Sequence, residues 1–542
     1  MSLSNPLYSK SRGGLAVAPH AQAAQSGADV LAAGGNAIEA CVAMAATLAA
    51  VYPHMTGLGG DGFWLLHQPG GQVQSVLGCG RSAMGIDREH YLDAGYTSIP
   101  YRGSQAANTV AGTVSGWEQA LEISNRQWHG KLPLSHLLGD AIRYCREGYR
   151  VTESQASATA GGLDQLAKQP GFAELFLCDG KPPVAGSLLT QPALADTLER
   201  LAEAGLDDFY HGELARLISH DLAQIGSPLT RGDLVQHRAQ LAEPVCLRTA
   251  TAEIFSTPAP TQGVATLMLL GQFARRPEGL ATREDVDTVH WLVEATKRAF
   301  EIRNRQVRAP DLMGEPAQAL LGDDRLDALA ATIDARTAAP WGAATNPADT
   351  TWFGAIDAEG RSVSCIQSIY HEFGSGVVLP ATGICWQNRG ASFSLEAGHP
   401  LQLTPQTLPF HTLCPSMAHF DDGRRMVFGT MGGDGQPQTQ AILFTRYADY
   451  GQPLEQAVAA PRWVLGRTWG DHSDNLKLEA RFDPALIEVL RQRGHDLMLI
   501  DDYDETVGHA GAVVWHPYGL VEGAADPRSD GAAIAPTGGG KA

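Results

Sequence analysis

The chain has 542 residues, of which 44% are hydrophobic and 18% charged, so it can bury a large core and is not a disordered polypeptide. Its 59 acidic residues outnumber its 40 basic ones, and the net charge of −19 argues against binding to nucleic acid or to an anionic membrane surface. Length alone would allow about three to four domains. The 60 glycines follow no collagen-like repeat, so we expect them in turns and at close backbone contacts.

The first part of the chain predicts strands and two helices. Residues 15–20 predict a strand, and residues 21–33 predict a helix that ends at the two following glycines. Asn36 is expected to cap a second helix, which is apolar on nearly all sides and should be buried. The stretch TGLGGDG at residues 56–62 contains GxGxxG, but a helix pattern precedes it and a strand at 63–67 follows. We therefore interpret it as a tight turn with positive φ, and not as a nucleotide-binding loop.

The middle of the chain is mostly helical in pattern. Residues 115–240 include helices expected at 189–204 and 213–225, and a strand at 252–256 comes before a long helix at 285–305. Residues 323–349 are rich in Ala, Asp, Thr and Pro and are weakly patterned, which predicts a mobile surface segment.

The last third of the chain begins with a change to β-type alternation at Thr350. Residues 352–357 and 362–369, separated by a short turn, predict a hairpin. The remaining expectations are strands at 377–387 and 426–430, a helix at 438–450, and disorder over residues 537–542.

Cysteine usage and apolar runs bear on the compartment. The eight cysteines form no CxxC pair and no Cys/His cluster with zinc spacing, so we expect buried thiols in a reducing compartment and no metal site. The first residues lack the apolar run of a signal peptide, and the longest apolar stretch, residues 40–52, is too short to span a bilayer. These features predict a cytoplasmic protein.

The junction at Thr350 carries the first chemical signal. A polar tract runs directly into a strand that begins with a hydroxyl residue, which is the layout of an N-terminal-nucleophile hydrolase. Cleavage between Asp349 and Thr350 would free an α-amine with a pKa of about 7.7–8.0, which can act as the base for the hydroxyl of the same residue. The alternative is an ordinary strand start with two threonines.

Five stretches, in chain order, carry a resemblance to a known family. They are GGNAIEA at 34–40, PHMTGLGG at 53–60, GTVSG at 112–116, TTWF at 350–353 and the glycine pair at 432–433. These are similar to the GGNAxxA, EPxxxGxGG, PGTVxG, TTHYS and oxyanion-hole motifs of the γ-glutamyltranspeptidase family, although Ala111 stands where Pro is usual. The chain resembles this family over almost its whole length.

The resemblance implies a fold and a processing event. It implies an α+β fold, a four-layer αββα sandwich, that forms one body instead of several domains. The precursor would be cut into a large subunit, residues 1–349, and a small subunit, residues 350–542, and a further dimer of this pair is left open. Neither a metal nor an organic cofactor would be required.

The resemblance also implies residue roles. Thr350 would be the nucleophile, and Ser368 stands where the family has a threonine that hydrogen-bonds the nucleophile. Gly432 and Gly433 would offer backbone N–H groups to the tetrahedral oxyanion. Arg81 falls where the family has an arginine that binds the substrate carboxylate.

Departures from the family pattern indicate a different substrate. Ser392 replaces the acid that would pair with a γ-glutamyl ammonium group, and Arg389 replaces a glutamine. Tyr370 replaces an asparagine, and His411 and Thr412 replace a serine pair. A buried ammonium group needs an acidic partner, so the sequence predicts an anionic substrate without an ammonium group, in a pocket made smaller by bulkier side chains.

We therefore expect hydrolysis of the amide of a small carboxylic acid, with oxamate as the best candidate and ammonia as a product. A glutaryl-type acylase activity is a second possibility within the family. The alternatives left open are a γ-glutamyl hydrolase or transferase that acts on glutathione-like amides, and an unprocessed, inactive binding protein on the same fold.

Overall fold

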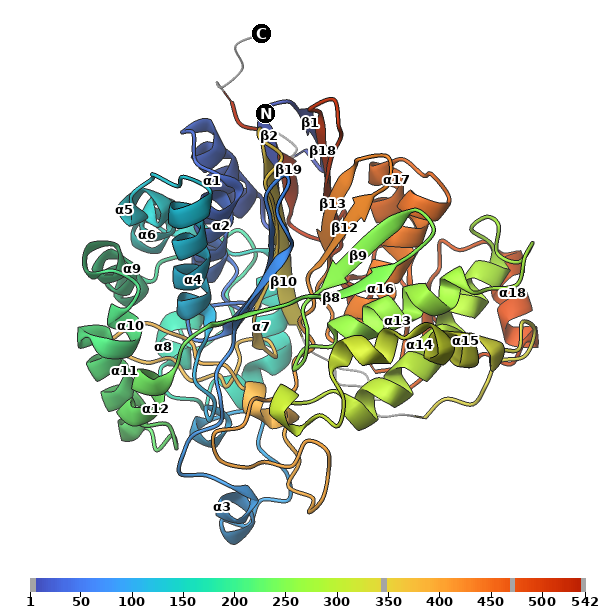
Figure 1. Cartoon of the computed structure of the whole chain (residues 1–542). Coiled ribbons are helices and arrows are strands. Elements are labelled where there is room, and N and C mark those ends of the chain that lie inside the picture. Colours follow the sequence, from blue (N-terminus) through green and yellow to red (C-terminus); the bar gives the residue numbers. More distant parts are fainter. Residues whose placement is uncertain (1–5, 343–348, 468–472, 538–542) are drawn as a thin grey trace.

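The computed structural model describes residues 6–342, 349–467 and 473–537 (Figure 1). Two antiparallel sheets of seven strands lie face to face, and helices cover the outer face of each sheet. This is the four-layer αββα sandwich expected from the sequence. In the described part of the chain, no helix is long and apolar enough to cross a membrane.

The first sheet, here called the Thr350 sheet, has the strand order β19-β2-β10-β11-β3-β4-β7. Its strands are β19 (Ala532–Ile534), β2 (Gly14–Ala18), β10 (Asp349–Asp357), β11 (Ser362–Tyr370), β3 (Asp61–His67), β4 (Gln74–Gly78) and β7 (Gln240–Ala242). The second, here called the opposite sheet, has the order β1-β18-β17-β13-β12-β9-β8. Its strands are β1 (Tyr8–Ser11), β18 (Val521–Ala525), β17 (Gly511–Trp515), β13 (Arg425–Gly429), β12 (Ser416–Phe420), β9 (Ala252–Ser256) and β8 (Val245–Arg248).

The core between the sheets is built from alternate residues of their strands. Side chains such as Phe63, Ile366 and Trp352 from the Thr350 sheet pack against Val427 of the opposite sheet and its neighbours. Each such buried side chain contributes roughly 1.5–3 kcal/mol. Glycine is required opposite Trp352, because a Cβ atom at residue 429 would lie 2.1 Å from its ring.

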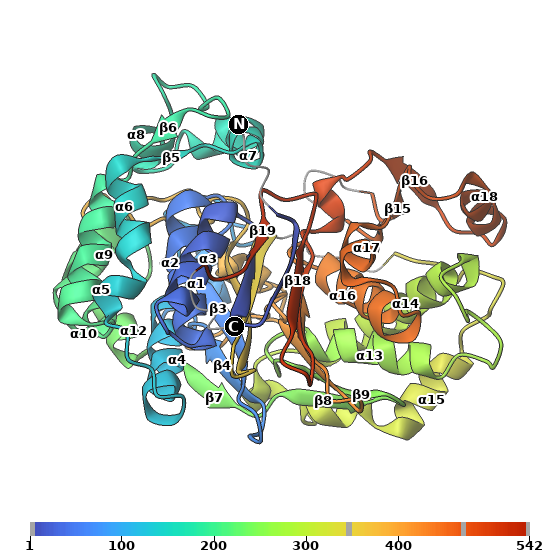
Figure 2. The ribbon, with the colours of Figure 1, turned by 90° about the horizontal axis from the view of Figure 1, so that it is seen from above.

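Helices on the outer face of the Thr350 sheet begin with the two predicted ones. These are α1 (Ala21–Ala32) and α2 (Ala37–Val51), which pack on each other and on the sheet. All residues of α2 are buried, and Asn36 and Glu39 form a capping box at its start. The rest of this layer surrounds them (Figure 2): α4 (Thr113–Gln127), α5 (Leu134–Leu137), α6 (Gly139–Glu147), α7 (Glu153–Leu166), α8 (Phe172–Phe176), α9 (Pro192–Ala204), α10 (Asp208–His211), α11 (Glu213–Gln224) and α12 (Arg231–Gln236), with the small sheet of β5 (Tyr149–Arg150) and β6 (Leu188–Leu189). The short helix α3 (Arg88–Asp93) lies apart from the layer, beyond one end of the sheets (Figure 1).

Helices on the outer face of the opposite sheet include α14 (Val286–Gln306), which begins after its capping residue Asp285 as predicted. The others are α13 (Gly263–Ala274), α15 (Asp323–Ala331), α16 (Gly435–Phe444), α17 (Leu454–Ala459) and α18 (Pro484–Gln492), with a three-stranded sheet of β14 (Trp463–Leu465), β15 (Leu476–Glu479) and β16 (Leu497–Ile500). The predicted hairpin is β10 and β11, and the strands at 252–256 and 426–430 correspond to β9 and β13. The helix expected at 438–450 is α16, which begins earlier and continues into a π-helical turn, Thr445–Asp449.

Two predicted elements were wrong. Residues 377–387 form no strand and contribute only isolated bridges, Val378 with Cys385 and Trp386 with Gly59, and Gly383 adopts positive φ within the segment. Residues 323–331 form α15, which packs Leu326 and Ala330 into the core beside α13. The rest of the expected mobile tract includes residues 343–348, and the expected disordered end includes 538–542; both ranges lie outside the described residues.

Two further expectations need correction. None of the glycines in residues 56–62 has positive φ. Glycine is needed there for close packing, since a Cβ atom would lie 2.2 Å from the Cys385 oxygen at Gly59 and 2.1 Å from the Ser368 oxygen at Gly60. The eight cysteines are all free thiols, but Cys178 is exposed and Cys246 is only half-buried.

Candidate active site

Thr350 is the second residue of β10 and is buried between the two sheets. The register between β10 and β11 shifts at this point, with Asp349 opposite Tyr370 and Thr351 opposite Gln367. Trp352, two residues along, faces the inter-sheet core, and a strand alternates its side chains between faces. At the register shift the direction of the Thr350 side chain is given by a contact, its hydrogen bond with the first turn of α16, which follows β13 of the opposite sheet.

The hydroxyl of Thr350 has a donor that sequence reasoning missed. The Nε2 group of Gln436, in the first turn of α16, donates to Thr350 Oγ1 at 3.2 Å. The other end of the same amide is fixed, because Gln436 Oε1 accepts from the backbone N–H of Cys414 at 3.1 Å. The amide orientation is therefore set so that a donor faces the hydroxyl.

Ser368 lies beside Thr350 on the neighbouring strand. Its hydroxyl accepts a hydrogen bond from the Tyr370 N–H at 2.7 Å. In the next strand, β3, the residue directly opposite Ser368 is Asp61. Ile366, two residues before Ser368, and Phe63, two residues after Asp61, both face the inter-sheet core. Thr350, Ser368 and Asp61 thus form a row across three adjacent strands, on the face that meets the opposite sheet.

Gly432 and Gly433 form the turn between β13 and α16. Their φ angles are +112° and +52°, in the region that favours glycine. The Gly432 carbonyl accepts from the N–H of Gly435 at 2.7 Å, so the planar trans peptide directs the N–H of Gly433 the opposite way. Within the described residues, neither Gly432 nor Gly433 donates its N–H to a protein acceptor. Two free donors of this kind can bind an oxyanion.

A buried network on the helical side positions this turn. Gln262 Nε2 donates to the Gly433 carbonyl at 2.8 Å and to the Thr412 carbonyl at 2.7 Å. Arg303 of α14 donates to Gln262 Oε1 at 2.6 Å and pairs with Asp434 at 2.7 Å. Both charges are almost fully buried. The network thus connects the glycine turn, the residue at 412 and the long helix.

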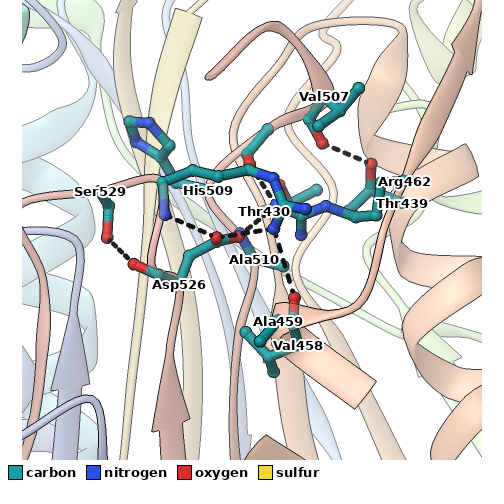
Figure 3. A network of polar contacts seen from close by, with 12 residues as sticks. Thr430, Thr439, Val458, Ala459, Arg462, Val507, His509, Ala510, Asp526 and Ser529 are labelled. Atoms are coloured by element: carbon teal, nitrogen blue, oxygen red, sulfur yellow. Dashed lines mark hydrogen bonds and ion pairs between the residues drawn. The ribbon is translucent and has the colours of Figure 1, made fainter. Parts of the chain in front are cut away.

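A second network, which includes Arg462 and Asp526 (Figure 3), contacts the segment that leads into the same turn. Arg462 donates to the Gly508 carbonyl at 2.7 Å and pairs with Asp526, whose carboxylate also accepts from the Ala510 N–H. Burial would raise the pKa of Asp526, but Arg462 and the neighbouring Arg528 hold it below its usual value. Gly508 packs so closely that a Cβ atom there would lie 2.8 Å from the Met431 oxygen, next to Gly432. The network therefore supports the turn through Gly508.

Arg389 brings a buried cation to the site. Its guanidinium carbon lies 3.7 Å from the centroid of the Tyr370 ring, and Tyr370 has a φ of +83°, which is unusual for a residue with a side chain. Burial lowers the pKa of Arg389, but Tyr370 and Asp61 oppose the shift, and a guanidinium stays charged at neutral pH. Its Nη2 group has no hydrogen-bond partner in the described chain.

Other predicted substrate residues also present buried polar atoms without partners. Within the described ranges, the hydroxyls of Ser392 and Thr412 and both ring nitrogens of His411 form no hydrogen bond. Each buried polar group left unpaired costs about 1–3 kcal/mol. Several together next to a cation are typical of a site that binds a small polar anion.

Asp61 was not predicted as a site residue, although an acid within a glycine-rich stretch was visible in the sequence. Its Oδ1 accepts from the Gly112 N–H at 3.0 Å and from Gln387 Nε2 at 3.2 Å. Burial raises the pKa of Asp61 to about 7, against the opposing effect of Arg389. Its Oδ2 lies 3.8 Å from His411 Nε2. Burial and then Arg389 lower the pKa of His411 well below its usual range, so this contact joins a neutral ring to the acid and is not an ion pair.

Arg81 does not contact this group of residues. Its Nη1 donates to the Gln406 carbonyl at 2.8 Å, and its side chain lines a cavity of about 280 Å³ together with His237 and Arg238. Cys79 lines the same cavity and directly follows the β4 residue that pairs with Gly62, so the cavity begins next to Asp61. The structure thus places Arg81 beside the row of site residues and not against Thr350.

The αββα fold, with a threonine near the start of a central strand and two free N–H groups in a facing turn, defines the class of N-terminal-nucleophile hydrolases. The Gamma-glutamyltranspeptidase family profile matches residues 23–536, and the chain belongs to this family. It is an amidohydrolase of that family.

Individual relatives cover nearly the whole chain. The chain is 53% identical over 520 residues to the oxamate amidohydrolase proenzyme of Klebsiella pneumoniae, covering 96% of this chain and 98% of that protein. It is 39% identical over 521 residues to the glutathione hydrolase-like YwrD proenzyme of Bacillus subtilis, with the same coverage. The crystal structure of cephalosporin acylase from Bacillus halodurans aligns with a TM-score of 0.89 at 30% identity, over 99% of this chain and 98% of that one.

Proposed function

We propose that this chain is an autoprocessing amidohydrolase that cleaves the amide of a small carboxylic acid, with oxamate as substrate and oxalate and ammonia as products. One observation carries the proposal. A buried guanidinium, Arg389, has an unpaired donor, and Ser392, His411 and Thr412 also carry unpaired buried polar atoms, while position 392 holds a hydroxyl and not an acid. The 53% identical relative named oxamate amidohydrolase supports the same substrate.

In this proposal the precursor is cut between Asp349 and Thr350, giving residues 1–349 and 350–542. Both relatives named above are described as proenzymes, which supports a processed enzyme. The two pieces stay together, because β10 is hydrogen-bonded on both sides, to β11 and to β2 of the large piece. The proposal allows two such pairs to associate into a heterotetramer. Free thiols throughout favour a reducing, cytoplasmic compartment.

The reaction begins when the freed α-amine of Thr350 takes the proton of its own hydroxyl. The Oγ1 atom then attacks the amide carbon, with Ser368 and Gln436 positioning the nucleophile. The N–H groups of Gly432 and Gly433 stabilise the oxyanion. Ammonia leaves with a proton returned from the amine, and water resolves the acyl-enzyme. No step needs a metal or an organic cofactor.

Arg389, Ser392 and Thr412 bind the substrate carboxylate in this scheme. A guanidinium and two hydroxyls supply the charge-assisted hydrogen bonds that a carboxylate requires. Tyr370 and His411 limit the length of the acyl group. Arg81, on the wall of the neighbouring cavity, attracts the anion as it approaches.

A γ-glutamyl hydrolase is the second candidate, and one observation favours it. Asp61 supplies an acid from another strand, which could pair with an ammonium group even though position 392 does not. The purified protein should be incubated separately with oxamate and with a γ-glutamyl anilide. We expect ammonia from oxamate and little aniline release. Strong release from the anilide with none from oxamate would contradict the proposal.

A further inference from the structure

Asp61 and Arg389, a carboxyl group and a guanidinium, lie in the same buried site but do not pair with each other. Each influences the pKa of the other, yet no ion pair joins them within the described ranges. Each also has one polar atom, Asp61 Oδ2 and Arg389 Nη2, without a hydrogen-bond partner there. Leaving a buried cation and a buried carboxyl oxygen without partners is costly. A ligand that contacts both would remove this cost.

The two oxygens of Asp61 have different environments. Oδ1 is occupied by the Gly112 N–H and by Gln387 Nε2, so it contributes to the structure of the strand ends. Oδ2 has no hydrogen-bond partner within the described residues and lies 3.8 Å from the neutral His411 ring, which is too far for a hydrogen bond. A carboxylate held by one oxygen presents the other as an acceptor of fixed direction.

The row across the sheet places this acceptor relative to the nucleophile. Asp61 is directly opposite Ser368, and Ser368 neighbours Thr350, with about 4.8 Å between adjacent strands. A small amide whose carbonyl carbon lies over Thr350 can therefore extend along the row toward β3. Its nitrogen carries N–H donors, and Asp61 Oδ2 is an unpaired acceptor on the β3 side of the row.

We propose that Asp61 is a specificity-determining residue that accepts a hydrogen bond from the amide nitrogen of the substrate, while Arg389 binds the carboxylate. The inference rests on the proposed function and names the feature that the site selects, an unsubstituted amide next to a carboxylate. In such a substrate the two groups are on adjacent carbons, so one small molecule can reach both charged residues.

Asp61→Asn tests the inference, because the asparagine side chain keeps an acceptor at one oxygen position and places a donor at the other. The asparagine oxygen takes the place of Oδ1, where Gly112 and Gln387 both donate. Its NH₂ group then replaces Oδ2 and opposes the N–H of the substrate. Monomethyl oxalate has an ester oxygen where oxamate has its nitrogen, so the variant should accept the ester better than the amide.

The measured quantity is the ratio of kcat/KM for oxamate to kcat/KM for monomethyl oxalate. We expect Asp61→Asn to lower this ratio on the order of 100-fold, since a site built to bind an N–H group discriminates strongly against its loss. Asp357→Asn is the matched control: Asp357 is a buried acid with a raised pKa at the far end of β10, and its substitution should leave the ratio unchanged. An unchanged ratio in Asp61→Asn would overturn the inference.

Two outcomes separate this inference from the proposed function. If the wild type hydrolyses oxamate and Asp61→Asn keeps the wild-type ratio of kcat/KM for oxamate to that for monomethyl oxalate, only the inference is contradicted. If the wild type releases no ammonia from oxamate, both the proposed function and the inference are contradicted. If Asp61→Asn fails to fold, the wild type still provides a measurement: N,N-dimethyloxamate, which has no N–H, should be hydrolysed about 100-fold less efficiently than oxamate. Equal efficiency would contradict the inference.

Discussion

At the scale of single residues, the hydroxyl of Thr350 meets a donor supplied from a distant part of the chain. Gln436 is held through its oxygen by Cys414 and directs its NH₂ group to Oγ1. A donor in this position lowers the energy of the oxygen once its proton has been taken. The same contact fixes the rotamer from which Oγ1 can attack.

Replacing Gln436 with Glu keeps the shape of the side chain but removes this donor. Because a hydrogen bond of this kind is worth about 0.5–1.5 kcal/mol, we expect kcat to fall by about 3- to 10-fold with little change in KM. Steady-state kinetics would measure both constants. Gln440→Leu, one turn further along α16, removes contacts to Ser416 and Cys414 and should lower the melting temperature without this loss in kcat. A kcat of Gln436→Glu equal to that of the wild type would exclude a direct effect on the nucleophile.

At the scale of elements, the turn at Gly432 and Gly433 depends on contacts with the long helix α14. Arg303 of α14 contacts both Gln262 and Asp434, and Gln262 holds the Gly433 carbonyl. On the other side, Gly508 packs against the same turn and is held by Arg462. Contacts on two sides thus position the turn, although its own sequence is a flexible glycine pair.

Arg303→Met should impair catalysis more than binding. It leaves Asp434 buried without its cation, a change that costs about 3–5 kcal/mol of stability in comparable pairs. We expect a lower melting temperature together with a kcat loss larger than the change in KM, because the displaced N–H groups act on the transition state. The double variant Arg303→Met with Asp434→Leu removes both charges and should recover stability but not kcat. Recovery of both would mean that the network serves only folding.

At the scale of the whole molecule, sequence reasoning succeeded where the signal was local or ordered along the chain. The capped helix after Asn36, the hairpin at Thr350 and the four-layer fold were all predictable from periodicity, capping and motif order. Residues 377–387 were wrongly predicted as a strand, because apolar composition does not reveal that a glycine at 383 takes positive φ. The helix at 323–331 was missed because tertiary packing on α13 outweighs a weak pattern.

The position of Thr350 in a central strand was predictable from the sequence, and the polar residues around it were less so. Asp61 and Gln436 were missed because each meets Thr350 or Ser368 only through sheet register or helix packing across some 90 to 300 residues of chain. Arg81 was identified by motif alone, and its orientation depends on a contact with the Gln406 carbonyl that no motif encodes. Contacts between distant segments therefore decide which polar residues face the substrate.

The central claim, that Thr350 becomes a new N-terminus and acts as the nucleophile, concerns the covalent state of the whole chain. Intact mass spectrometry of the purified wild type and of Thr350→Ala tests it most directly. We predict that the wild type gives two masses, those of residues 1–349 and 350–542. Thr350→Ala should stay at full length and release no ammonia from oxamate. A wild type that stays full-length, with Thr350→Ala retaining the same activity, would contradict the account.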